Sequence, residues 1–283
     1  MRGLRPGEDE HPGRGPLRRE AGGGQSGRPE APGPPVLSLS WILLDAGNTL
    51  IGLDYALVVA ALGQRGFAAD ELTLRRAETT ARRSLDRAIW ARWREGPVPR
   101  TGWIEATVWG RFWREVLELA GADPYRSEEL AETVLAVTRP AASWTRVDSG
   151  TPPVLDRLRR AGCRLGVVSN SSGGLAGHLG ALGLAGRFDF ILDSHHVGVE
   201  KPHPAIFELA LRRAGGVPAG DALYVGDVYA IDVLGAAGAG LHAMLFDPLG
   251  QWDAASLPRD APPCRAIASL AELEGIWERR SRS

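Results

Sequence analysis

The feature that most constrains the fold of this chain is a short apolar run that recurs five times along it. Residues 41–44 are all apolar and stop at Asp45, which begins a segment typical of a tight turn, so they predict a buried strand. Similar runs lie at 165–168, 188–192, 223–225 and 242–246, and helical patterns lie near 153–161, 174–183, 203–215 and 229–237. This alternation predicts an α/β fold, a doubly wound parallel sheet covered by helices on both faces.

Residues 54–144 interrupt this alternation, because they contain no segment typical of a strand. Their pattern predicts three or four helices, a long one from about Ala69 to Arg94 and another from about Thr101 to Ala120. The segment follows the first predicted strand, so we expect it to stand over the carboxyl end of that strand. We therefore predict an α/β core of residues 40–53 and 145–283, with residues 54–144 inserted as a helical cap.

Residues 1–39 differ in composition from the rest of the chain, being rich in Gly, Pro, Arg and Glu and poor in large apolar side chains. Such a segment cannot offset its ordering entropy by burial, so we predict a disordered N-terminal extension. It lacks the apolar stretch of a secretory signal, and its acidic residues argue against a transit peptide. A start codon assigned too far upstream would also account for it.

The overall composition excludes several classes of partner. The formal net charge is −1, without the basic excess expected of a nucleic-acid-binding protein, and no stretch approaches the roughly 18 consecutive apolar residues of a membrane span. The two cysteines, Cys163 and Cys264, provide neither a disulfide framework nor a metal-binding knuckle. We therefore expect a cytoplasmic protein with a small-molecule partner, and the sequence carries no signal of an oligomeric state.

Polar residues gather at the carboxyl ends of the predicted strands, where open α/β sheets bind their ligands. Asp45 follows the first strand and Ser169–Asn170 the second. Lys201, the only lysine in the chain, comes after the third, and Gly226–Asp227 ends the fourth, with Asp232 five residues later. Since these strand ends meet at one edge of the sheet, we expect the side chains to form one site.

The residue types in this site predict binding of a divalent cation and of phosphate. Asp45, Asp227 and Asp232 would place three carboxylates together, which is unfavourable unless a cation bridges them. Hard oxygen ligands suit Mg²⁺, which keeps several waters and accepts a substrate phosphate. The Ser169 hydroxyl and the backbone amides after it can donate to phosphate oxygens, and Lys201 supplies a positive charge beside them.

Four blocks of the sequence resemble the four ordered motifs of the haloacid dehalogenase (HAD) superfamily: Asp45–Leu50, Ser169–Asn170, Glu200–Pro202 and Gly226–Asp232. The helical insertion between the first two blocks resembles the type 1 cap of that superfamily. The resemblance extends over about residues 40–250. It implies a hydrolase, more narrowly a phosphatase that acts on a small phosphorylated metabolite with Mg²⁺ as its cofactor.

The resemblance also implies a role for each residue of the site. Asp45 would attack phosphorus and form an aspartyl-phosphate, which water then hydrolyses. Mg²⁺ would be held by the Asp45 carboxylate, the Gly47 carbonyl and Asp227, with Asp232 holding a metal-bound water or the lysine. Ser169, Asn170 and Lys201 would bind the phosphate, and Thr49 would stabilise the loop that carries Asp45.

Gly47 is where this sequence departs from the superfamily pattern. Most phosphatases of the superfamily carry a second aspartate at this position, which protonates the leaving oxygen and later activates water. General acid–base catalysis of this kind contributes roughly 10²–10⁴-fold. A glycine keeps the backbone carbonyl for the metal but removes the acid–base group.

Three interpretations of Gly47 are open. In the first, the chain hydrolyses an acyl or aryl phosphate whose leaving group needs little protonation, or a cap residue supplies the proton. In the second, it is a catalytically reduced protein that binds phosphate or docks a partner. In the third, it is a dehalogenase or another non-phosphatase HAD enzyme. The pair Asp227 and Asp232 disfavours a dehalogenase, and residues 54–144 lack the lysine of a phosphonate hydrolase.

Overall fold

The computed structural model describes residues 39–102, 106–253 and 261–280, which belong to one compact unit. The predicted N-terminal extension, residues 1–39, lies outside the described residues except for Leu39, which is buried. Among the described helices, none combines the length and the apolar character that crossing a membrane would require.

The core is a six-stranded sheet in which every neighbouring pair of strands is parallel. The strand order is β3-β2-β1-β4-β5-β6, so β1 lies between β2 and β4. The strands are β1 (Trp41–Leu44), β2 (Arg164–Ser169), β3 (Phe190–Asp193), β4 (Ala222–Gly226), β5 (His242–Phe246) and β6 (Arg265–Ile267). All of their carboxyl ends therefore meet at one edge, which is the edge where the sequence predicts a site.

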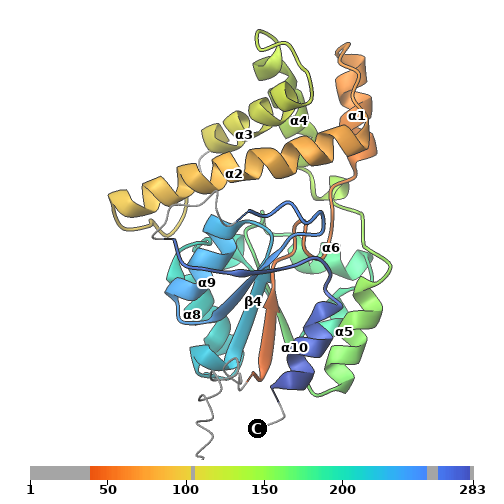
Figure 1. Ribbon diagram of the computed structural model, residues 1–283. Helices are drawn as coiled ribbons and strands as arrows, with labels where there is room; N and C mark the ends of the chain where they lie inside the picture. The colour runs from red at the N-terminus through yellow and green to blue at the C-terminus, as the bar shows by residue number, and fades with distance from the viewer. Residues whose placement is uncertain (1–38, 103–105, 254–260, 281–283) are drawn as a thin grey trace, which may run out of the picture. The chain divides into compact units, whose positions relative to one another are not determined.

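Helices cover both faces of this sheet because successive side chains of a strand point to opposite sides. In β1, Ile42 and Leu44 pack in the same cluster as α5 (Thr151–Arg160), α6 (Leu175–Ala181) and α10 (Glu272–Arg279). Trp41 and Leu43 face the other way, toward α8 (Pro204–Arg213) and α9 (Leu234–Gly238). Figure 1 shows α5 and α10 on one side of the strands and α8 and α9 on the other. The doubly wound α/β fold predicted from the sequence is confirmed.

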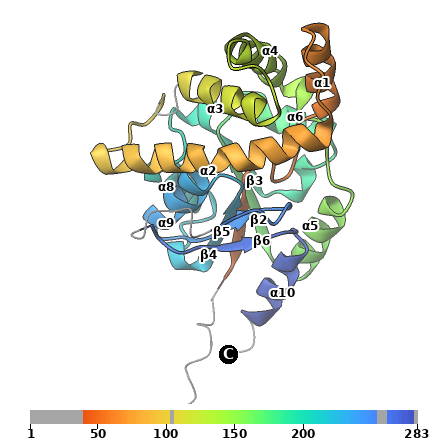
Figure 2. The ribbon, with the colours of Figure 1, turned by 45° about the horizontal axis from the view of Figure 1, so that its top comes forward.

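Four helices lie between β1 and α5 in the sequence: α1 (Tyr55–Gln64), α2 (Glu71–Glu95), α3 (Ala106–Leu119) and α4 (Ser127–Thr138). We call them the helical layer, and their apolar side chains share one core. Asp70 caps the start of helix α2, because its side chain accepts a hydrogen bond from the Thr73 amide. Figures 1 and 2 show α2 crossing above the carboxyl ends of the strands. The division into a core and a cap domain of residues 54–144 stays a prediction.

The remaining elements are short: the 3₁₀ turns η1 (Ala141–Ser143), η2 (Ala185–Arg187) and η3 (Ala219–Asp221), the helix α7 (Ser194–Val197) and the π-helical turn η4 (Tyr229–Val233). The structure differs from the sequence-based expectation at η4, at β6 and at the C-terminal helix α10, which the sequence analysis does not predict. The helix expected near 229–237 starts as η4 and becomes α-helical only at α9. Strand β6 is not predicted because it has three residues, of which only Ile267 is buried.

Candidate active site

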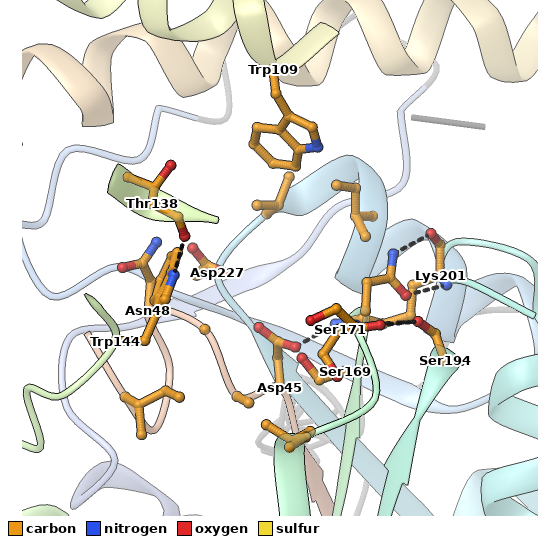
Figure 3. A pocket seen from close by; sticks show the side chains of 18 of the residues that line it. Asp45, Asn48, Trp109, Thr138, Trp144, Ser169, Ser171, Ser194, Lys201 and Asp227 are labelled. Carbon is orange, nitrogen blue, oxygen red and sulfur yellow. Dashed lines mark hydrogen bonds and ion pairs between the residues drawn. The ribbon is translucent and has the colours of Figure 1, made fainter. Parts of the chain in front are cut away.

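A cavity of about 590 Å³ opens where the carboxyl ends of the strands face the helical layer, and Figure 3 shows it from close by. Seven of the residues predicted from the sequence line it: Asp45, Gly47, Ser169, Asn170, Lys201, Asp227 and Asp232. Thr49 does not line it, and its buried hydroxyl has no hydrogen-bond partner among the described residues. The structure thus brings all the predicted site residues to one place except Thr49.

Three carboxylates and one ammonium group form the floor of the cavity. One carboxylate oxygen from each of Asp45, Asp227 and Asp232 lies within 4.8 Å of the others. The Lys201 Nζ donates to Asp45 Oδ1 at 2.6 Å and to Asp232 Oδ1 at 2.7 Å. Lys201 and Asp232 are almost completely buried, so these charges interact with little solvent screening.

The side chain of Asn170 holds the backbone of Lys201 in place. Its Oδ1 accepts from the Lys201 amide at 2.8 Å, and its Nδ2 donates to the Lys201 carbonyl at 2.9 Å. Both ends of the Asn170 side chain are therefore engaged by a segment 31 residues away. Asn170 thus positions Lys201, while one N–H of its Nδ2 remains, and the phosphate contact expected from the sequence stays a prediction.

The end of β4 is built around Asp232. The Val228 amide donates to Asp232 Oδ2 at 2.9 Å, and the Tyr224 hydroxyl lies 3.1 Å from Asp232 Oδ1 and 2.9 Å from Lys201 Nζ. A Cβ atom on Gly226 would stand 2.3 Å from Asp232 Cγ, so only glycine allows this close approach. Asp232 is thus locked beside the lysine.

Asp227 is paired with a cation from the helical layer that the sequence does not single out. Arg82 of α2 donates to the carboxylate of Asp227 and, at 3.0 Å, to its backbone carbonyl. The same guanidinium donates to Glu78 Oε1 at 2.8 Å. The side chains of Arg82 and Glu78 are only 18% and 11% exposed, so this network is largely shielded from water.

The acidic cluster is short of positive charge. Burial raises the pKa of Asp45 to about 6, although Lys201 opposes the shift. Burial also raises the pKa of Asp227, against the effect of Arg82. Burial acts to lower the pKa of Lys201, but Asp232 and Asp45 raise it above its usual value, so the ammonium group stays charged. A further cation among the carboxylates would favour their charged forms.

The loop after β1 offers one more oxygen to such a cation. It is closed by hydrogen bonds from Asn48 N to Ile51 O at 2.7 Å and from Leu50 N to Ala46 O at 2.9 Å. Within the described residues, no backbone hydrogen bond of this loop ends on the Gly47 carbonyl. Three carboxylates and a carbonyl are the hard oxygen donors that Mg²⁺ prefers, so the residues present fit this ion.

The segment after β2 carries the candidate phosphate donors. Ser169, at the strand end, is buried and lines the cavity. The amides of Ser171 and Gly173 donate to Ser194 and Asp193, so these two amides are already engaged. The Ser171 hydroxyl lines the cavity and has no hydrogen-bond partner among the described residues. It is a second hydroxyl donor that the sequence interpretation does not single out.

The residues that sequence reasoning misses share one property: their role depends on tertiary contacts. Arg82 is one of many arginines in α2, and its only local signal is the four-residue spacing from Glu78. Tyr224 lies within an apolar strand and therefore looks like an ordinary core residue. Trp144, which lines the cavity beside Gly47, lies outside every regular helix and strand.

Comparisons with known proteins agree with this geometry. The sequence profile of the haloacid dehalogenase-like hydrolases matches residues 39–240. Haloacid dehalogenase-like hydrolase domain-containing protein 3 of Homo sapiens is 34% identical over 180 residues, which cover 63% of this chain and 68% of that protein. Phosphoserine phosphatase of Thermus thermophilus is 34% identical over 172 residues, which cover 60% of this chain and 67% of that protein.

A solved structure supports the fold independently. The HAD-hydrolase YfnB of Bacillus subtilis, in a crystal form bound to magnesium, aligns with a TM-score of 0.58 at 18% sequence identity. The alignment covers 84% of this chain and 98% of that one. Since the family profile matches well over half of the residues, the chain belongs to the haloacid dehalogenase-like hydrolases.

Proposed function

We propose that this chain is a Mg²⁺-dependent phosphatase of small phosphorylated compounds, with Asp45 as its nucleophile. The observation that carries the proposal is the convergence of Asp45, Asp227 and Asp232 within 4.8 Å, with Lys201 Nζ 2.6 Å from the nucleophile. The similarity to a phosphoserine phosphatase supports phosphate ester chemistry. The modest net charge of −1 suits a small metabolite better than a nucleic acid, and we expect the protein to act in the cytoplasm.

The residues divide the work between binding and chemistry. Mg²⁺ would be held by Asp45, the Gly47 carbonyl and Asp227, with Asp232 beside them, and when bound it would neutralise negative charge on the phosphoryl oxygens. Asp45 attacks phosphorus, and the bond to the leaving oxygen breaks. Lys201 offsets the charge of the transferred group from its position against Asp45. Water then hydrolyses the aspartyl-phosphate, which releases phosphate and restores the carboxylate.

Acetyl phosphate tests this proposal directly, because its leaving group is acetate and needs no proton. We expect Mg²⁺-dependent hydrolysis that is lost in EDTA and falls by at least about 10³-fold in Asp45→Asn. Acid quenching during turnover should trap a phosphorylated protein that the variant does not form. Equal rates for the native protein and Asp45→Asn would overturn the proposal.

A second candidate function is a phosphate-binding protein without turnover. Two observations favour it: position 47 lacks a carboxylate, and Arg82 occupies a carboxylate expected to bind the metal. Phosphate binding by calorimetry together with no hydrolysis of acetyl phosphate would support this second function over the first.

A further inference from the structure

The wall of the cavity beside Gly47 is an indole ring. A Cβ atom built on Gly47 would lie 3.5 Å from Trp144 Cζ3 and 3.9 Å from Trp144 Cη2. Both distances are ordinary van der Waals contacts. The side from which a residue at position 47 would reach a leaving group is therefore faced by aromatic carbon.

Trp144 is held firmly in this place. Its indole Nε1 donates to the Thr138 carbonyl at 2.8 Å, a contact visible in Figure 3, and its amide donates to the Ala141 carbonyl at 2.9 Å. Its own carbonyl lies 2.7 Å from His178 Nε2, which must donate because a carbonyl only accepts. These contacts hold the indole ring in one position, so it is pre-organised for stacking. Nε1 of Trp144 and Nε2 of His178 both donate to backbone carbonyls and are not available to a ligand.

A second group of aromatic side chains, from helix α3, also lines the cavity. Trp109 of α3 points down into the cavity in Figure 3, and Phe112 and Trp113 of the same helix also line it. Aromatic side chains bury large areas and prefer other π-systems in offset or edge-to-face contact. The cavity therefore suits a flat aromatic group held between the helical layer and the loop after β1.

Among the described residues that line the cavity, we find no unengaged carboxyl group that could replace the acid–base aspartate missing at position 47. Apart from the acidic cluster, the described lining residues include two glutamates, Glu78 and Glu200. Glu78 is ion-paired with Arg82, and Glu200 Oε2 accepts from the Gly102 amide at 3.0 Å. Both glutamates are thus already engaged with groups of the protein, Glu78 with a guanidinium and Glu200 with a backbone amide.

We propose that the substrate is an aryl phosphate, whose phenolic oxygen leaves as an anion while its ring stacks on Trp144 and Trp109; this inference rests on the proposed function. The bond from Asp45 to phosphorus forms, the bond from phosphorus to the phenolic oxygen breaks, and the phenolate takes a proton from water. A phenol has a pKa of about 10, as tyrosine does, whereas an aliphatic alcohol is a far weaker acid, comparable to water. A site without a general acid discriminates strongly between the two.

Three esters of similar size separate leaving-group acidity from ring recognition. Phenyl phosphate has an aromatic ring and a phenolic oxygen, benzyl phosphate has the ring on an alkyl oxygen, and cyclohexyl phosphate has neither. We expect kcat/KM for phenyl phosphate to exceed that for benzyl phosphate by about 100-fold or more. Benzyl phosphate should in turn inhibit phenyl phosphate hydrolysis about tenfold more tightly than cyclohexyl phosphate.

Variants of the two tryptophans test the stacking. Trp144→Leu and Trp109→Leu should each raise KM for phenyl phosphate about tenfold relative to KM for acetyl phosphate. Trp109→Leu provides a second test if Trp144→Leu fails to fold. Trp90→Leu is the matched control, because Trp90 packs on the core of the helical layer without lining the cavity, and it should leave this ratio unchanged.

The outcomes keep the two proposals apart. Hydrolysis of acetyl phosphate with equal kcat/KM for phenyl and benzyl phosphate would overturn the aryl assignment and leave the phosphatase intact. The same holds if the tryptophan variants leave the KM ratio unchanged. Absence of acetyl phosphate hydrolysis would contradict the proposed function, and the aryl assignment with it.

Discussion

Arg82, on helix α2, holds both the carboxylate and the backbone carbonyl of Asp227, 145 residues further along the chain. The helical layer therefore places a permanent positive charge on an oxygen that a divalent cation would also need. Glu78, one turn earlier on the same helix, fixes the guanidinium in this position. Arg82 and a bound Mg²⁺ would therefore compete for the same Asp227 carboxylate.

Replacing Arg82 with glutamine should strengthen metal binding. The variant frees Asp227 and removes a neighbouring charge, which is worth about 1 kcal/mol or more at such short range, so we expect about tenfold tighter binding of Mg²⁺. Isothermal titration calorimetry on the metal-free protein measures this without a substrate. Arg76→Gln, on an exposed position of the same helix, is the control and should bind Mg²⁺ like the native protein. Unchanged or weaker binding by Arg82→Gln would show that the arginine does not compete.

Lys201 should matter for stability as well as for chemistry. Lys201→Met leaves Asp45 and Asp232 buried without their partner, and breaking a buried ion pair in this way costs about 3 kcal/mol or more. Urea unfolding in EDTA should reveal this loss, and Mg²⁺ should restore part of it because the ion replaces the missing positive charge. Arg213→Met, on an exposed position, controls for the substitution itself. If Lys201→Met were destabilised equally with and without Mg²⁺, the ion would not replace the positive charge of Lys201, and this prediction would be wrong.

Asp86 should make the protein less stable as pH rises. Burial raises the pKa of Asp86 to about 7 from an ordinary value of 3.8. The folded state therefore holds a proton that the unfolded state releases between about pH 4 and 7, and the stability linked to that proton is lost over this range. Asp86→Asn stays neutral and still accepts from the Ala230 amide, a bond of 2.9 Å in the native protein.

We therefore expect Asp86→Asn to match the native protein near pH 4 and to be more stable at pH 8, by on the order of 3 kcal/mol. Urea unfolding at both values of pH measures the difference. Asp123→Asn is the matched control, because Asp123 also accepts from a backbone amide but is exposed. A pH-independent difference between Asp86→Asn and the native protein would contradict the titration.

Restoring a carboxylate at position 47 should widen the range of substrates. The position has ordinary contacts for a Cβ atom and no left-handed backbone, so the backbone at Gly47 accepts a side chain. We expect turnover of benzyl phosphate to rise by about tenfold or more, because the new carboxyl group can protonate an alkyl oxygen. Hydrolysis of acetyl phosphate should change little. Gly47→Asn has the same shape without the proton, and an equal gain in both variants would rule out acid catalysis.

The site residues that could be predicted from the sequence are those with a local signal, either a position after an apolar run or a residue type that occurs once. Asp45, Ser169 and Asp227 stand directly after apolar runs, and Lys201 is the only lysine. In a parallel sheet such positions must converge, since all strand ends meet at one edge. The local sequence pattern and the topology of the sheet are therefore enough to predict that these residues lie together.

The residues that could not be predicted act across the fold. Arg82 meets Asp227 only because α2 crosses the strand ends, and no periodicity distinguishes it from the other arginines of that helix. Asn170 also holds the backbone of Lys201, a contact between distant segments that no local pattern indicates. Strand β6 is too short to give a signal and forms because Phe246 and its neighbours offer an edge for pairing.

Arg82 and Asp86 lie four residues apart, so they project from the same face of α2. Both reach the segment that follows β4, Arg82 at Asp227 and Asp86 at the Ala230 amide. A movement of α2 away from this segment would therefore break both contacts together. Loss of the Asp86 contact and release of the Asp227 carboxylate would then be a single event, which would leave that carboxylate free for a cation.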